Sequence, residues 1–122
     1  MHNALAFAHL FIGESGTMAS ESAVLGTPAI FVNSKHFGCI DDQANYGLVF
    51  TYTESEKDQI QAIEKAEEIA TNINAKQELI AKRNNLLADK IDVTEFLVWF
   101  VENYPESVKE VKAKDFDFGR FK

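Results

Sequence analysis

The segment from Leu10 to Val32 constrains the fold more than any other part of the sequence. A short apolar run ends at Gly13, a turn rich in glycine and hydroxyl residues follows, and a helix-forming stretch leads to Gly26. A second apolar run, with β-branched and aromatic residues, occupies Pro28 to Val32. Buried parallel strands are continuous apolar runs of this kind, and a helix is their usual connection. The segment therefore predicts a strand, a glycine-rich loop, a helix and a second strand of an α/β domain.

The flanking sequence extends this pattern in both directions. Apolar residues between Leu5 and His9 predict a short helix before the first strand. Beyond the second strand, Asp41 or Asp42 is a candidate cap for a helix that ends near Tyr46, and Leu48 to Tyr52 predicts a third strand. Three strands make a short parallel sheet, so we expect a three-layer α/β domain.

The second half of the chain is helical by its apolar spacing. Ser55 is a candidate cap for one helix, residues 75–91 form a second, and apolar residues recur at helical spacing from Val93 to Tyr104. The remaining residues carry mixed charges and three phenylalanines, and the sequence leaves open whether they dock on a partner or are loosely ordered. We divide the chain into a domain at 1–104 and a tail at 105–122.

Charge and cysteine content exclude several classes of function. Twelve Lys and Arg against nineteen Asp and Glu give a net charge of -7, which opposes binding to nucleic acids and anionic membranes. The lone Cys39 excludes an internal disulfide and fits a cytoplasmic location, and the apolar stretch at residues 1–12 is too short to span a membrane. His2, His9 and His36 lack the spacing of metal ligands, so we expect neither a metal nor a cofactor.

The turn between the first strand and its helix is a candidate anion site. Main-chain N–H groups at a helix start point at one spot, and the helix dipole favours negative charge there. The turn is not a P-loop, because no Lys follows Gly16, and the spacing of Gly13 and Gly16 is not that of a dinucleotide fingerprint. A structural alternative is equally open: the glycines serve only the turn, and Ser15 or Thr17 serves only as a helix cap.

A longer motif includes this turn. Ser15-Gly16-Thr17, followed by Glu21 and by Leu25-Gly26-Thr27-Pro28, resembles the nucleotide-sugar signature in the C-terminal half of GT-B-type glycosyltransferases and UDP-N-acetylglucosamine 2-epimerases. Within that superfamily the chain is most similar to the DUF354 family. The resemblance implies a UDP-sugar ligand whose pyrophosphate and ribose hydroxyls are held by this turn and by the glutamate. The substrate-binding residues that it implies here are Gly13, Ser15, Gly16, Thr17 and Glu21.

A second motif, Asp42-Gln43 with Asn45, resembles the acidic-Gln pair with which GT-B transferases contact the donor sugar. The alternative is a plain helix cap with exposed polar residues. Such proteins have two Rossmann-like domains with the active site between them. The resemblance therefore implies a partial Rossmann-like fold of the GT-B C-terminal type, in which this chain looks like the last part of the nucleotide-binding domain, without the acceptor-side domain and its catalytic groups.

Two functions from different classes follow. The first is a donor-side module of a glycosyltransferase or epimerase-like protein, which binds a nucleotide sugar but is not catalytic alone. The second is a non-catalytic structural or interaction protein without nucleotide binding. An incomplete sheet and an apolar helix at 93–104 predict a homodimer or a partner in the form of the missing N-terminal domain.

Overall fold

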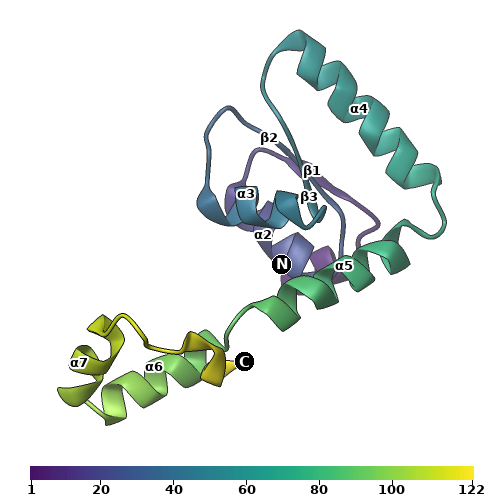
Figure 1. Cartoon of the computed structure of the whole chain (residues 1–122). Coiled ribbons are helices and arrows are strands. Elements are labelled where there is room, and N and C mark those ends of the chain that lie inside the picture. The colour runs from purple at the N-terminus through teal and green to yellow at the C-terminus, as the bar shows by residue number, and fades with distance from the viewer. The chain divides into compact units, whose positions relative to one another are not determined.

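The computed structural model describes residues 1–122 and divides into two compact units, Met1–Leu86 and Leu87–Lys122 (Figure 1). The first unit contains α1 His2–Phe7, β1 Phe11–Gly13, α2 Gly16–Leu25, β2 Ala29–Val32, α3 Gly38–Asn45, β3 Val49–Tyr52 and α4 Glu56–Thr71, and α5 Ala75–Asp89 begins in it. The second contains α6 Val93–Glu102, α7 Glu106–Lys112 and the 3-10 helix η1 Phe118–Phe121. None of these helices combines the length and apolar character needed to cross a membrane.

The three strands form one parallel sheet in the order β1-β2-β3. Ala29 at the start of β2 pairs with Phe11 of β1 on one side and with Val49 of β3 on the other. This confirms the predicted α/β class and its short parallel sheet. The strands were predictable because each is a largely apolar run. Only β2 is covered along its whole length, whereas Ile12 of β1 and Thr51 of β3 are exposed.

Helices cover the two faces of the sheet, with α2 and α3 on one side and α4 on the other (Figure 1). Alternate residues of a strand point to opposite faces, so Phe31 faces α2 and α3 whereas its neighbour Ile30 faces α4. The core on the first face comprises Ala19, Ala23, Ala29, Phe31, Ile40, Leu48, Val49, Leu79 and Leu86. The core on the second face comprises Ile30, Ala62, Ile69 and Ala75.

Hydrogen bonds from two distant residues hold the C-terminal end of α1. The buried Thr27 Oγ1 donates to the carbonyl oxygens of Leu5 at 2.7 Å and Ala8 at 3.3 Å. Lys76 Nζ of α5 donates to the carbonyl oxygen of Ala6 at 2.6 Å. The Leu5 carbonyl oxygen also accepts from the N–H of Ala8 at 3.2 Å, and the two side chains complete the hydrogen bonding of the carbonyls at this helix end in place of water.

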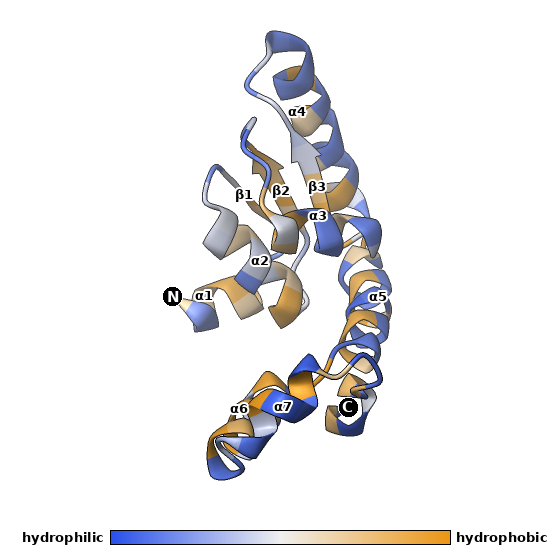
Figure 2. Ribbon diagram, turned by 60° about the vertical axis from the view of Figure 1, so that its left-hand side comes forward, coloured by the Kyte–Doolittle hydropathy of each residue, from blue (hydrophilic) through white to orange (hydrophobic).

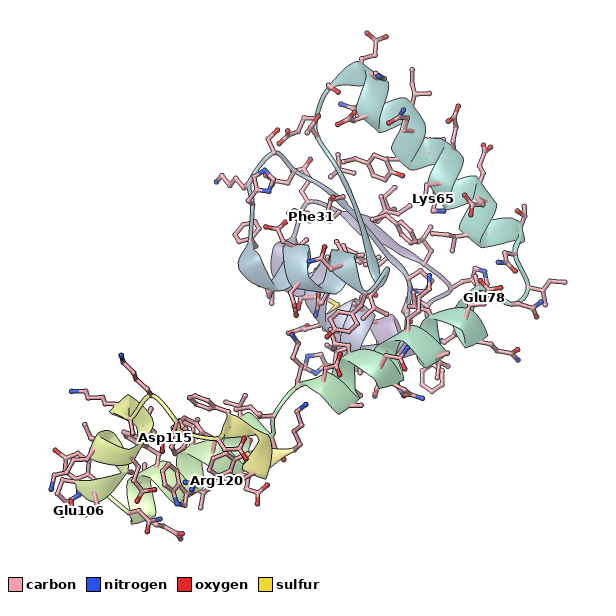
Figure 3. All side chains as sticks on the ribbon, viewed as in Figure 1. Phe31, Lys65, Glu78, Glu106, Asp115 and Arg120 are labelled. Atoms are coloured by element: carbon pink, nitrogen blue, oxygen red, sulfur yellow. The ribbon has the colours of Figure 1, made fainter.

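The second unit is built around aromatic side chains. Six aromatic rings of α6 and the C-terminal segment lie with neighbouring ring centroids 4.7–6.5 Å apart. These residues are Phe96, Trp99, Phe100, Phe116, Phe118 and Phe121. The guanidinium of Arg120 lies 4.0 Å from the centre of the Trp99 ring (Figure 3). The C-terminal segment is therefore packed against α6 of its own chain, which differs from both sequence-based alternatives, a loosely ordered tail and a tail docked on a partner.

Several helix boundaries differ from the sequence-based expectation; α1 spans His2–Phe7 rather than Leu5 to His9, and α5 ends at Asp89 rather than at residue 91. Helix α3 begins at Gly38, three residues before the nearer expected cap, because the extended backbone of Phe37 starts it without a side-chain cap. Helix α6 ends at Glu102 rather than at Tyr104. The compact units meet at 86/87, whereas the functional division at 104/105 rests on sequence alone.

Candidate functional site

The start of α2 has the geometry of an anion site. Ser15 is the N-cap, with φ -85° and ψ 109°, and its Oγ accepts a hydrogen bond from the Met18 N–H at 3.3 Å. The N–H groups of Gly16 and Thr17 have no partner within the chain, and the first turn contains no acidic residue. Two unsatisfied donors and the positive end of a ten-residue helix therefore meet at one place.

This helix start opens onto a hollow of about 300 Å³. Its α2 wall is one face of the helix, because residues at spacings of three and four lie on the same side. The lining residues are Gly16, Thr17, Ser20, Glu21, Phe37 and Cys39. The structure thus brings together three of the predicted substrate-binding residues, namely Gly16, Thr17 and Glu21.

Phe37 explains why a glycine stands at position 16. A Cβ atom built on Gly16 would lie 3.3 Å from the Phe37 ring, closer than ordinary van der Waals contact. The Phe37 ring is fixed in turn by an edge contact with Phe31, at a centroid distance of 5.9 Å. Figure 3 shows Phe31 between the sheet and the loop that leads to α3. A side chain at position 16 would therefore require the Phe37 ring to move by a few tenths of an ångström.

Glu21 lies one and a half turns along α2 from Gly16 and borders two hollows. The second hollow, of about 360 Å³, is mostly apolar and is lined by His2, Ser20, Glu21, Val24 and Leu25. Glu21 Oε2 lies 3.2 Å from His2 Nε2, and both side chains are accessible to solvent. The carboxylate is thus available at the boundary between a hollow that begins at the helix start and a more apolar one.

The remaining predicted site residues lie outside these hollows. Gly13 ends β1 and Ser15 is occupied as the helix cap. Gln43 is buried: its Nε2 donates to the Ser20 Oγ at 2.9 Å, and its Oε1 has no hydrogen-bond partner. Asp42 is half-buried on the same helix. Asp42 and Gln43 lie inside α3 and do not cap it. Their predicted contact with a donor sugar stays a prediction.

Sequence reasoning missed three lining residues. Helical spacing could have identified Ser20, because this residue follows Gly16 by about one turn and lies on the same face of α2. Phe37 and Cys39 come from the loop after β2 and the first turn of α3. Their approach to α2 depends on tertiary packing, which no local pattern encodes.

Comparison of the chain with protein families, with curated proteins and with solved structures gave no match.

Proposed function

We propose that the start of α2 binds the diphosphate of a nucleotide sugar, with a UDP-sugar as the expected ligand. The observation that carries the proposal is the pair of unpartnered N–H groups at Gly16 and Thr17, which open onto a hollow that also contains a carboxylate. Main-chain donors at a helix start bind phosphate oxygens without a metal. The same donors stabilise a departing diphosphate in glycosyl transfer, so the chain would serve as the donor-side module.

Glu21 supplies the second point of recognition. At 1.5 Å of rise per residue, its Cα lies roughly 7.5 Å along the helix from that of Gly16. A carboxylate accepts hydrogen bonds from two neighbouring hydroxyls, which makes Glu21 the residue for the ribose diol. Its contact with His2 is solvent-exposed and in competition with water, so a bound diol can replace it at little cost.

Isothermal titration with UDP and UDP-N-acetylglucosamine tests the proposal. We expect both to bind, and Glu21→Ala to weaken UDP by about 1.5–3 kcal/mol, the range for hydrogen bonds to a charged group. Glu67→Ala, which removes an exposed helix acid outside both hollows, is the control and should leave the affinity unchanged. Absence of UDP binding to the wild type, or equal affinities of the two variants, would overturn the proposal.

An interaction function is favoured by a separate observation on α6. Three residues of α6 at helical spacings of four, and Tyr104 just beyond its end, keep 52–71% of their surface exposed. The three residues of α6 are Val93, Leu97 and Val101. Val98 beside them is 51% exposed, and hydrophobic colour covers much of this helix in Figure 2. An apolar stripe of this kind marks a contact surface on a folded protein.

For this second function we propose a homodimer in which the α6 stripes of two copies pack antiparallel. Under a two-fold axis the stripe meets itself, so apolar residues face apolar residues along its whole length. Light scattering at micromolar concentration should give twice 13.7 kDa. Leu97→Gln with Val101→Gln should restore the monomer, whereas Glu102→Gln should not. A wild-type monomer would exclude this assembly.

A further inference from the structure

A third hollow lies beyond the carboxyl ends of β2 and β3, where the connections that follow these two strands separate. After β2 the chain turns to α3 on one face of the sheet, and after β3 it turns to α4 on the opposite face. In open α/β sheets ligands bind outside the carboxyl ends of the strands. A hollow of about 100 Å³ occupies this position between β2 and β3. Its lining includes no residue of α2, so it is separate from the proposed nucleotide site.

The two loops around this hollow are tied to one another. The Ser34 N–H donates to both carboxylate oxygens of Glu54, at 3.1 and 3.0 Å, and the Ser34 hydroxyl also bonds to Glu54. Thr53 directly follows β3, and its N–H and Oγ1 donate to Oδ2 of Asp58 in the first turn of α4, at 2.8 and 2.5 Å. The loop after β2 and the loop after β3 are therefore held in a fixed relation before any ligand arrives.

These bonds also keep both carboxyls ionised. Hydrogen bonds from Ser34 lower the pKa of Glu54, and hydrogen bonds from Thr53 lower the pKa of Asp58. Ionised carboxylates only accept hydrogen bonds. The rim of the hollow thus presents a permanent acceptor at Asp58 on the β3 side.

The lining combines an apolar floor with polar groups of both kinds. Phe31 and Ile40, each 1% exposed, lie beneath the hollow. The rim carries Asp58 and also Asp41, whose Oδ1 lies 3.6 Å from His36 Nδ1. The side-chain amide of Asn33 and the ammonium of Lys35 supply donors, whereas those of Ser34 and Thr53 already bind Glu54 and Asp58. No group of three or more His, Cys, Asp or Glu in the chain is placed to hold a metal ion.

Size and polarity together select a small hydroxyl-bearing ligand. Since one water occupies about 30 Å³ of liquid, the hollow accommodates roughly three water-sized groups. A row of neighbouring hydroxyls both donates to carboxylates and accepts from N–H groups, while its carbon side rests on an apolar floor. We propose that this hollow binds vicinal hydroxyl groups, presented by a short polyol or by the edge of a sugar ring.

Titration of the ¹⁵N-labelled full chain with glycerol and with N-acetylglucosamine tests this site and distinguishes the two sources. We expect saturable amide shifts at residues 33–36 and 51–58, with glycerol alone if the site takes a free polyol, and with the sugar if it takes a ring edge. UDP should not shift the resonances of these amides. Absence of glycerol or sugar binding at this hollow and absence of UDP binding at the start of α2 are therefore separate results.

Asp41→Asn keeps the shape of the rim and removes one charged acceptor, so binding should weaken roughly three- to tenfold. Glu56→Gln removes an acid from the first turn of α4 outside the hollow and is the control. The proposal is overturned if neither probe gives saturable shifts at these amides up to about 100 mM, a very weak limit. Equal affinities of the two variants overturn it as well.

Discussion

Replacement of Thr27 by Val isolates the bonds that hold α1 on the domain. Val has the shape of Thr but carries a methyl in place of the hydroxyl. In the folded chain that hydroxyl is fully buried and donates to the Leu5 carbonyl oxygen at 2.7 Å. The substitution therefore leaves buried carbonyl oxygens facing a methyl group, without creating a cavity.

The expected cost follows from the partners that remain. A net hydrogen bond contributes about 1 kcal/mol, and an acceptor left unsatisfied in the interior costs about 1–3 kcal/mol. Leu5 O retains the N–H of Ala8 at 3.2 Å, which places the penalty toward the lower end. We expect Thr27→Val to lower the free energy of unfolding by about 1.5–2.5 kcal/mol.

Urea unfolding followed by far-UV circular dichroism measures this loss, and Thr27→Ser is the matched comparison. Ser keeps the hydroxyl and loses only a methyl, so its cost should be near 1 kcal/mol. Amide exchange in α1 should accelerate more in the Val variant than in the Ser variant. If Thr27→Val proves as stable as Thr27→Ser, the hydroxyl contributes packing alone and the reasoning fails.

Three further changes have defined outcomes. Ser107→Ala removes a buried hydroxyl that donates at 2.7 Å to a carbonyl in α6, and should destabilise the second unit by about 1 kcal/mol in unfolding followed by Trp99 fluorescence. Arg120→Met removes the guanidinium above the Trp99 ring and should cost about 0.5–1 kcal/mol in the same assay; an unchanged midpoint contradicts a cation–π contribution. Hydrogen bonds from Ser34 lower the pKa of Glu54, so its carboxylate stabilises the fold above its ordinary pKa of 4.5 and loses this effect as the pH falls. Glu54→Gln should therefore flatten the loss of stability that urea titrations measure as the pH falls below 4.5.

The strands and most helix starts could be predicted from sequence because their signals are local. The runs that became β1, β2 and β3 are largely apolar, with Thr51 as the polar residue of β3. Ser55 and Asp92 cap their helices through their own side chains. The start of α3 escaped prediction because the backbone of Phe37, and no side chain, begins that helix.

The candidate site could be predicted only in part for the same reason. Gly16, Thr17 and Glu21 lie on one helix, so sequence spacing alone sets their relation. The aromatic wall formed by Phe37 depends on contacts between segments distant in the chain. The packing of the C-terminal phenylalanines on α6 is likewise a tertiary effect, which composition cannot distinguish from docking on a partner.

The hydrogen bonds from Thr27 and Lys76 to α1 also affect when this helix becomes fixed during synthesis. The carbonyl groups of residues 5, 6 and 8 find their side-chain partners only at residues 27 and 76. Between residue 8 and residue 76 lie 76 - 8 = 68 peptide additions, or roughly 3–14 s at about 5–20 residues per second. A helix of six residues is marginal in isolation, so α1 remains unformed during this interval. Helix α1 is thus made well before the residue that completes its hydrogen bonds, and it stays open to chaperones and proteases until α5 has emerged.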